Sequence, residues 1–338
     1  MSKLKKTQLI DGEHLFAQYV RILGKGKTGT RSLNKDEAYQ AMRMILSGEV
    51  EDVQLGAFLM LLRVKEESHD ELTGFVSAVK DHIQAPSTIS VDIDWSSYAG
   101  KKRQLPWFIL SCLLLAENGI RIYMHGANGH TLGRLYTEQV LNELKLPIAC
   151  SWQQVEQQLD HSCFSFMSLN ELCPELQAIM DLRHQFGLRS PVHTLSRLIN
   201  PLNASHSMQS VFHPAYGQSH QLAALELGQA NAAVFKGEGG EIERKPEANC
   251  TVKQVINGVA TEEIWPRFIE GRQQQHETLD VNLLRQCWQG NYKEEYAELA
   301  IVGTAAIALK LLGKANSQEQ ALHLSKQMWQ QRNKKRLA

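Results

Sequence analysis

Apolar residues recur with helical spacing in the first quarter of the chain. Leu15 and Tyr19 share one helical face, and later segments repeat the pattern at three- and four-residue intervals. Asn34, followed three residues later by Glu37, is a capping box that predicts the start of a further helix. These short amphipathic helices predict a small N-terminal helical domain over residues 1–84.

Beyond the helical region the pattern changes to alternating strands, turns and helices. Alternating apolar positions predict a strand that ends near Trp95, and a second short apolar run covers residues 120–124. This alternation predicts a larger α/β domain over residues 85–338, with a mostly parallel central sheet. Ligands of such open sheets bind outside the carboxyl ends of the strands. The loops 96–104 and 125–129 are therefore expected to face one cleft.

The loop 96–104 has an unusual composition for a turn between a strand and a helix. Gly100 is its only glycine, and Lys101, Lys102 and Arg103 follow it directly. A glycine-rich turn lets backbone N–H groups approach a phosphate closely. This loop attracts phosphates by charge but is poorly built to wrap a small diphosphate. Charge runs are, however, most often solvated turns.

Composition limits the possible functions. Among 338 residues, 36 are Lys or Arg and 36 are Asp or Glu, so a nucleic-acid partner would have to be bound by local clusters of cations. Six scattered cysteines include no C-x-x-C pair, which favours reduced thiols in a cytoplasmic protein. No apolar run is long enough to span a membrane, so no membrane partner is expected.

Several motifs resemble those of anthranilate phosphoribosyltransferases, and the resemblance covers nearly the whole chain. It implies the fold shared with pyrimidine nucleoside phosphorylases, in which a small helical domain is hinged to a larger α/β domain. It also implies a homodimer formed through the helical domain, to which a helix from residues 170–190 can contribute. The motifs lie at residues 42–50, 54–63, 125–126, 186–190 and 200–202.

The resemblance does not extend to the phosphoribosyl pyrophosphate loop. The family binds this donor with a G-T-G-G-D-G loop and an N-I-S-T segment, which the basic loop and an aromatic segment replace here. The family's magnesium-binding Asp-Glu pair falls at Glu241 and Ile242, which leaves Glu241 and Glu243 as weak metal candidates. The resemblance places a vestigial phosphoribosyl and acceptor pocket at Ser97, Gly100, His125, Gly126, Asn128 and Arg183.

A closer match is to the YbiB-type paralogues, on the motifs at residues 189–195 and 210–216. Those proteins keep the transferase fold, lack the parent activity and bind nucleic acid through a basic groove that spans a homodimer. The resemblance implies a sequence-nonspecific nucleic-acid-binding protein without a cofactor, with DNA as partner in preference to RNA. An exposed aromatic ring would favour single strands. The candidate contacts are Tyr98, Lys101, Lys102, Arg103, Arg134, Arg183, Arg189 and Arg197.

Trp107 and Phe108 are expected in the core rather than on a stacking surface, because they precede an apolar helix. No residue is assigned a catalytic role. The alternative function is an active glycosyl or phosphoribosyl transferase that uses phosphoribosyl pyrophosphate and Mg²⁺. In that case Arg183 would hold a carboxylate acceptor, while Glu241 or Glu243 would help to bind the metal.

Overall fold

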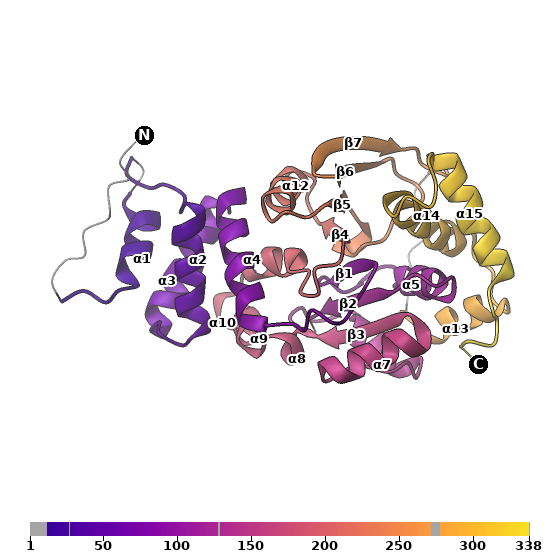
Figure 1. Ribbon diagram of the computed structural model, residues 1–338, viewed down its shortest axis with the longest axis horizontal. Helices are drawn as coiled ribbons and strands as arrows, with labels where there is room; N and C mark the ends of the chain where they lie inside the picture. The colour runs from indigo at the N-terminus through magenta and orange to yellow at the C-terminus, as the bar shows by residue number, and fades with distance from the viewer. Residues whose placement is uncertain (1–11, 27, 128, 272–277, 338) are drawn as a thin grey trace.

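The computed structural model describes residues 12–26, 28–127, 129–271 and 278–337, so the predicted pocket residue Asn128 lies outside the described residues. A helical bundle forms one end of the molecule and an α/β domain forms the rest (Figure 1). The predicted fold class, a small helical domain with a larger α/β domain, is confirmed. In the described part of the chain, no helix is long and apolar enough to cross a membrane.

Four helices make the bundle, and their caps follow from the sequence. Asn34 accepts a hydrogen bond from the Glu37 N–H at 2.9 Å, and the Glu37 carboxylate accepts one from the Asn34 N–H at 3.0 Å. The predicted capping box is therefore confirmed. The helices are α1 (Ala17–Gly24), α2 (Lys35–Leu46), α3 (Asp52–Lys65) and α4 (His69–Ile83).

Seven strands of the described chain form one sheet in the order β3-β2-β1-β4-β5-β6-β7. The pairings among β1 to β5 are parallel, whereas β6 pairs antiparallel with both β5 and β7. The parallel register places the carboxyl ends of β1, β2 and β3 side by side. The strands are β1 (Ile93–Ser97), β2 (Ile122–Gly126), β3 (Phe164–Ser168), β4 (His206–Val211), β5 (Asn231–Lys236), β6 (Cys250–Ile256) and β7 (Val259–Trp265).

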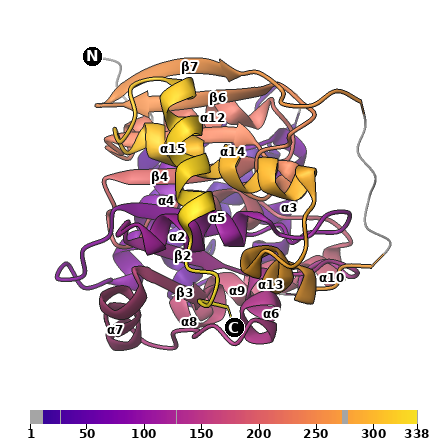
Figure 2. The same cartoon turned by 90° about the vertical axis from the view of Figure 1, so that its right-hand side faces the viewer.

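Apolar helices cover the sheet. On one side α5 packs against α14, which in turn packs against α15 (Figure 1; Figure 2). Trp107 and Phe108, which precede and begin α5, are 0% and 1% exposed, so their predicted place in the core is confirmed. The helices of this domain are α5 (Phe108–Glu117), α6 (Thr137–Glu143), α7 (Trp152–Ser162), α8 (Leu169–Leu172), α9 (Pro174–Asp181), α10 (Arg183–Phe186), α11 (Val192–Leu195), α12 (Tyr216–Glu226), α13 (Asn282–Gln289), α14 (Glu295–Leu311) and α15 (Gln318–Gln331), with 3₁₀ turns η1 (Ser196–Leu198) and η2 (Glu238–Gly240).

The bundle contacts the α/β domain through α4 and through helices from the 170–190 region. α4 packs against α12 (Figure 1). His82 at the end of α4 lies 3.3 Å from the carboxylate of Glu175 on α9. The Phe186 ring of α10 packs closely against Gly56 on α3. Segments far apart in the sequence therefore share the surface between the two parts.

Candidate functional site

The loops that follow β1 and β5 meet at the carboxyl edge of the sheet, and the Glu241 carboxylate lies between them. It accepts hydrogen bonds from the backbone N–H groups of Ala99 and Gly100, both at 2.6 Å, and from the Ser97 hydroxyl at 2.9 Å. Glu241 is 1% exposed. Converging backbone N–H groups in such a turn are the donors that would otherwise hold a phosphate. The chain's own carboxylate thus fills this small anion site.

Lys101 is fully buried in the same region, which corrects its prediction as a contact to a phosphate backbone. Its ammonium lies 2.6 Å from a Glu243 carboxylate oxygen and also bonds Glu238. The other Glu243 oxygen accepts the Phe108 N–H at 2.9 Å. Burial alone would lower the pKa of Lys101, but Glu243 and Glu238 together raise it above its usual value. Lys101 is therefore a charged structural residue.

Tyr98 is also buried, so its prediction as a ring for base stacking is corrected. The ring is 1% exposed, and its hydroxyl lies 2.6 Å from Nδ1 of His125. His125 Nε2 in turn lies 3.3 Å from Asp94. A Cβ on Gly126 would lie 2.1 Å from the Ser97 carbonyl oxygen, so only glycine fits where β1 and β2 approach. Ser97, His125 and Gly126, which belong to the predicted vestigial pocket, are therefore part of the domain's interior.

The four predicted arginines lie near one another. Burial, followed by the positive charges of Arg134, Arg197 and Arg183, lowers the pKa of Arg189 to about 10. Within the described residues, none of the four guanidinium groups has a carboxylate within ion-pair distance. Clustered like charges without ion-pair partners create a positive potential, which the nearby Glu241 lowers at Arg197. An anionic ligand would relieve this repulsion.

Backbone carbonyls hold most of these arginines in place. Arg134 donates to the carbonyls of Gly100 at 2.8 Å and Gly239 at 3.1 Å. Arg183 donates to the His130 carbonyl at 2.5 Å. Arg197 donates to three carbonyls and is only 6% exposed, so it contributes charge more than contact area. The predicted cluster thus keeps partly exposed side chains at Arg134, Arg183 and Arg189.

Two cavities open beside this cluster, and Phe212 lines both of them. The smaller one, here called the arginine cavity, has a volume of about 130 Å³ and includes Arg63, Arg189 and Arg197. The larger one, the basic cavity, has a volume of about 390 Å³. Its nine lining residues are Lys102, Arg103, Arg134, Phe212, Lys236, Gly237, Glu238, Gly239 and Lys245.

The basic cavity is strongly cationic, because its one acid, Glu238, is bonded to Lys101. Lys102, Arg103 and Lys236 are exposed, and no ion pair joins them to any residue that the structure describes. The sequence predicted Lys102 and Arg103 as candidates but missed Lys236 and Phe212. Lys236 is the last residue of an apolar strand. A cation at the carboxyl end of a strand, where ligands of such sheets bind, was the signal in the sequence that could have identified it.

His220 borders the arginine cavity as a buried neutral side chain. It is 1% exposed, and its Nδ1 lies 3.1 Å from Gln209 Oε1. Burial and then the charge of Arg197 lower the pKa of His220 to about 3. In the unfolded chain the ring would titrate near pH 6.5. Between about pH 3 and 6.5, protonation of His220 therefore favours the unfolded state.

We expect His220→Gln to flatten the pH dependence of stability. Because the folded pKa is the lower one, His220 favours folding above about pH 6.5, and its contribution falls by about 1.4 kcal/mol per unit as the pH drops below that value. Urea unfolding of both proteins between pH 7.5 and 5 measures the effect. The difference between their unfolding free energies should change with pH, and a constant difference would contradict the assignment.

Comparison with known proteins agrees with this architecture. A family model described as "Glycosyl transferase family, helical bundle domain" matches residues 17–83, and another described as "Glycosyl transferase family, a/b domain" matches residues 109–331. The second match alone spans more than half of the chain. The chain belongs to glycosyltransferase family 3.

Relatives of this family 3 protein include the uncharacterized protein YbiB of Escherichia coli K12, 28% identical over 69% of this chain and 73% of the relative. An anthranilate phosphoribosyltransferase of Syntrophomonas wolfei is 25% identical over 92% of each chain. The anthranilate phosphoribosyltransferase from Saccharomyces cerevisiae, solved in complex with PRPP and Mg, superposes with a TM-score of 0.78 at 14% identity over 93% of each chain. Because the identity of this last match is so low, the match shows a shared fold alone.

Proposed function

We propose that this family 3 protein binds nucleic acids without sequence specificity and prefers single-stranded DNA. The observation that carries the proposal is the basic cavity, where five of nine lining residues are Lys or Arg. Phosphates would contact Lys102, Arg103 and Lys236, with Arg134 and Arg189 extending the positive surface. Such contacts carry no sequence information, because they engage only the backbone of the strand.

Phe212 replaces Tyr98 as the proposed stacking residue. Its side chain is 46% exposed and lies between the arginine cavity and the basic cavity. An exposed ring flanked by cations is the usual arrangement for binding unpaired bases, because a base stacks on the ring while its phosphates meet the charges. This arrangement supports a preference for single strands.

The proposed active form is a homodimer in which the helical bundles meet. On α3, Val53 is 80% exposed and Val64 is 85% exposed. Their spacing of eleven residues places both on one side of the helix. Two such apolar faces would be buried against each other, and the footprint for a strand would extend over both protomers.

An active transferase is the second candidate, and the family membership favours it. The Mg²⁺ that it would require does not fit the carboxylates as they are arranged. Both oxygens of Glu241 accept hydrogen bonds from Ser97, Ala99 and Gly100. Both oxygens of Glu243 are engaged as well, by Lys101 and Phe108. Mg²⁺ needs free carboxylate oxygens, which these two residues do not offer.

Calorimetry distinguishes the two functions. We expect a 20-nucleotide oligo(dT) to bind saturably at low salt, and phosphoribosyl pyrophosphate with Mg²⁺ to release no measurable heat. Saturable micromolar binding of phosphoribosyl pyrophosphate, together with silence of the oligonucleotide, would reverse the assignment in favour of the transferase.

A further inference from the structure

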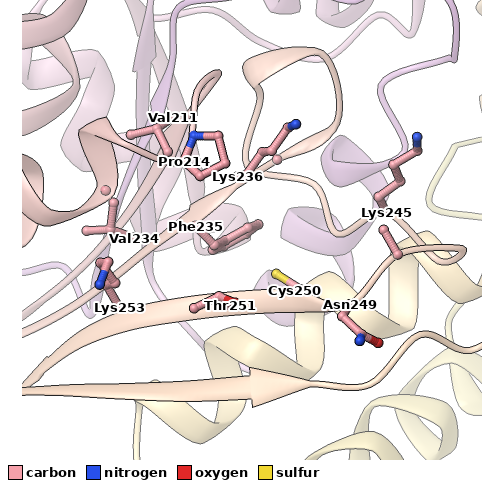
Figure 3. Close-up of a pocket in the computed structure, with 13 residues that line it drawn as sticks. Val211, Pro214, Val234, Phe235, Lys236, Lys245, Asn249, Cys250, Thr251 and Lys253 are labelled. Atoms are coloured by element: carbon pink, nitrogen blue, oxygen red, sulfur yellow. The ribbon is translucent and has the colours of Figure 1, made fainter.

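A third cavity of about 390 Å³ lies between the start of α12 and strands β5 and β6. It shares Lys236, Gly237 and Lys245 with the basic cavity, so the two spaces are contiguous. Figure 3 shows Phe235 and the Cys250 sulfur at its centre, with Lys236, Lys245 and Lys253 around them. We call it the apolar cavity, because side chains such as Val211, Pro214 and Val234 also line it.

The lysines around the apolar cavity differ in how far their charge is balanced. Lys253 lies 2.6 Å from Glu262, and Lys245 lies 3.2 Å from Glu247. Lys236 has no ion-pair partner among the residues that the structure describes. The least balanced charge is therefore at the junction of the apolar and basic cavities. An apolar space with a cationic entrance fits a ligand with a flat apolar body and an attached anion.

A nucleotide has this chemistry. Its base would lie against Pro214 and Ala248, because Val234 and Phe235 in the cavity wall are each only 1% exposed. Its phosphate would lie near Lys236 at the entrance. Thr251 and Asn249 also line the cavity and offer polar groups for the edge of a base. A volume of this size is at the lower end of typical small-ligand sites and exceeds what one base requires.

We propose that the apolar cavity receives one unpaired base of a bound single strand, while the adjoining phosphates contact Lys236 and Lys245. The inference rests on the proposed function and adds a mechanism for strand selection. Bases in a duplex are paired and stacked, and moving one into a pocket requires unstacking and unpairing. A single strand offers its bases at a lower cost, so the cavity would discriminate against duplexes.

The test fills the cavity without changing charge. Ala248, a half-buried residue in its lining, is replaced by Phe, and Ala260→Phe on exposed β7 serves as the matched control. Affinities for oligo(dT) and for a duplex of equal length are measured by fluorescence anisotropy. We expect Ala248→Phe to weaken single-strand binding about tenfold, as for loss of one stacked base, and to leave duplex binding and the control unchanged.

A second measurement uses the unmodified protein and needs no variant. An oligonucleotide with one 2-aminopurine changes its fluorescence when that base leaves the stack of its neighbours. We expect such a change on binding to the wild-type protein. Absence of any change would overturn the proposal.

The outcomes separate this inference from the proposed function. If the wild-type protein binds oligo(dT) but Ala248→Phe binds it equally well, the base pocket is wrong and the nucleic-acid function stands. If the wild-type protein binds no oligonucleotide, the function itself fails. If thymidine monophosphate alone binds more tightly than oligo(dT) and only the filled variant loses it, the cavity belongs to a free nucleotide, and the proposal is overturned.

Discussion

Replacing Lys101 with Ala is expected to lower the free energy of unfolding by about 3–5 kcal/mol, the range for breaking a buried ion pair from one side. Among the described residues, the substitution leaves the buried Glu243 carboxylate with the Phe108 N–H as its one donor, and it removes a partner of Glu238. Uncompensated charge in a low-dielectric interior is strongly unfavourable. Urea unfolding followed by circular dichroism measures the change.

Lys102→Ala is the matched control, because it removes the same side chain from the neighbouring exposed position. We expect this variant to change stability by less than about 0.5 kcal/mol and to weaken oligonucleotide binding instead. The two adjacent lysines should therefore separate folding from binding. The account would be contradicted if Lys101→Ala were as stable as the wild type and defective in binding.

Reversing both exposed charges of the loop is expected to have the largest effect on binding. Lys102→Glu with Arg103→Glu places two carboxylates in the basic cavity, where phosphates are proposed to lie. Losing two contacts of about 1.4 kcal/mol each corresponds to roughly 100-fold weaker binding at low salt. The weakening should be uniform across sequences, because these contacts engage phosphates only.

The matched control reverses two lysines outside the three cavities. Lys314→Glu with Lys326→Glu changes the net charge by the same amount at two exposed positions, one between α14 and α15 and one on α15. We expect this variant to bind oligo(dT) within about threefold of the wild type, since long-range charge alone is screened by salt. Equal loss in both double variants would mean that total charge, rather than the basic cavity, governs binding.

Local patterns in the sequence predicted the fold well. Capping at Asn34 depends on a residue three positions away, and the sequence before the basic loop alternates apolar and polar residues up to Trp95. Both signals lie within a few residues of the element that they specify. The order of the strands in the sheet was not predicted, because the sequence pattern alone does not say which strands are neighbours.

The burial of the Tyr98 and Lys101 side chains could not be predicted in this way. Lys101 is bonded by Glu243, which is 142 residues further along the chain, and Tyr98 by His125, which is 27 residues away. A run of three cations looks uniform in the sequence, yet folding buries the first and leaves the next two exposed. Side-chain burial is decided by partners that only the tertiary structure brings together.

The position of Glu241 links these corrections to the proposed function. Its carboxylate occupies the donors of a turn that would otherwise be suited to a small anion, so phosphates must be bound at the neighbouring surface. That surface holds Lys102, Arg103 and Lys236, whose charges no acid of the described chain balances by an ion pair. The same fold can thereby present an extended basic surface in place of a closed diphosphate site.

The salt dependence of oligo(dT) binding by the wild-type protein tests the central claim most directly. Each phosphate contact to a single strand contributes about −0.7 to the slope of log K against log salt concentration, so about four contacts predict a slope near −3. Anisotropy titrations between about 50 and 200 mM salt would measure it. A steep linear decline is the predicted result, whereas a flat dependence or no binding at low salt would contradict the account.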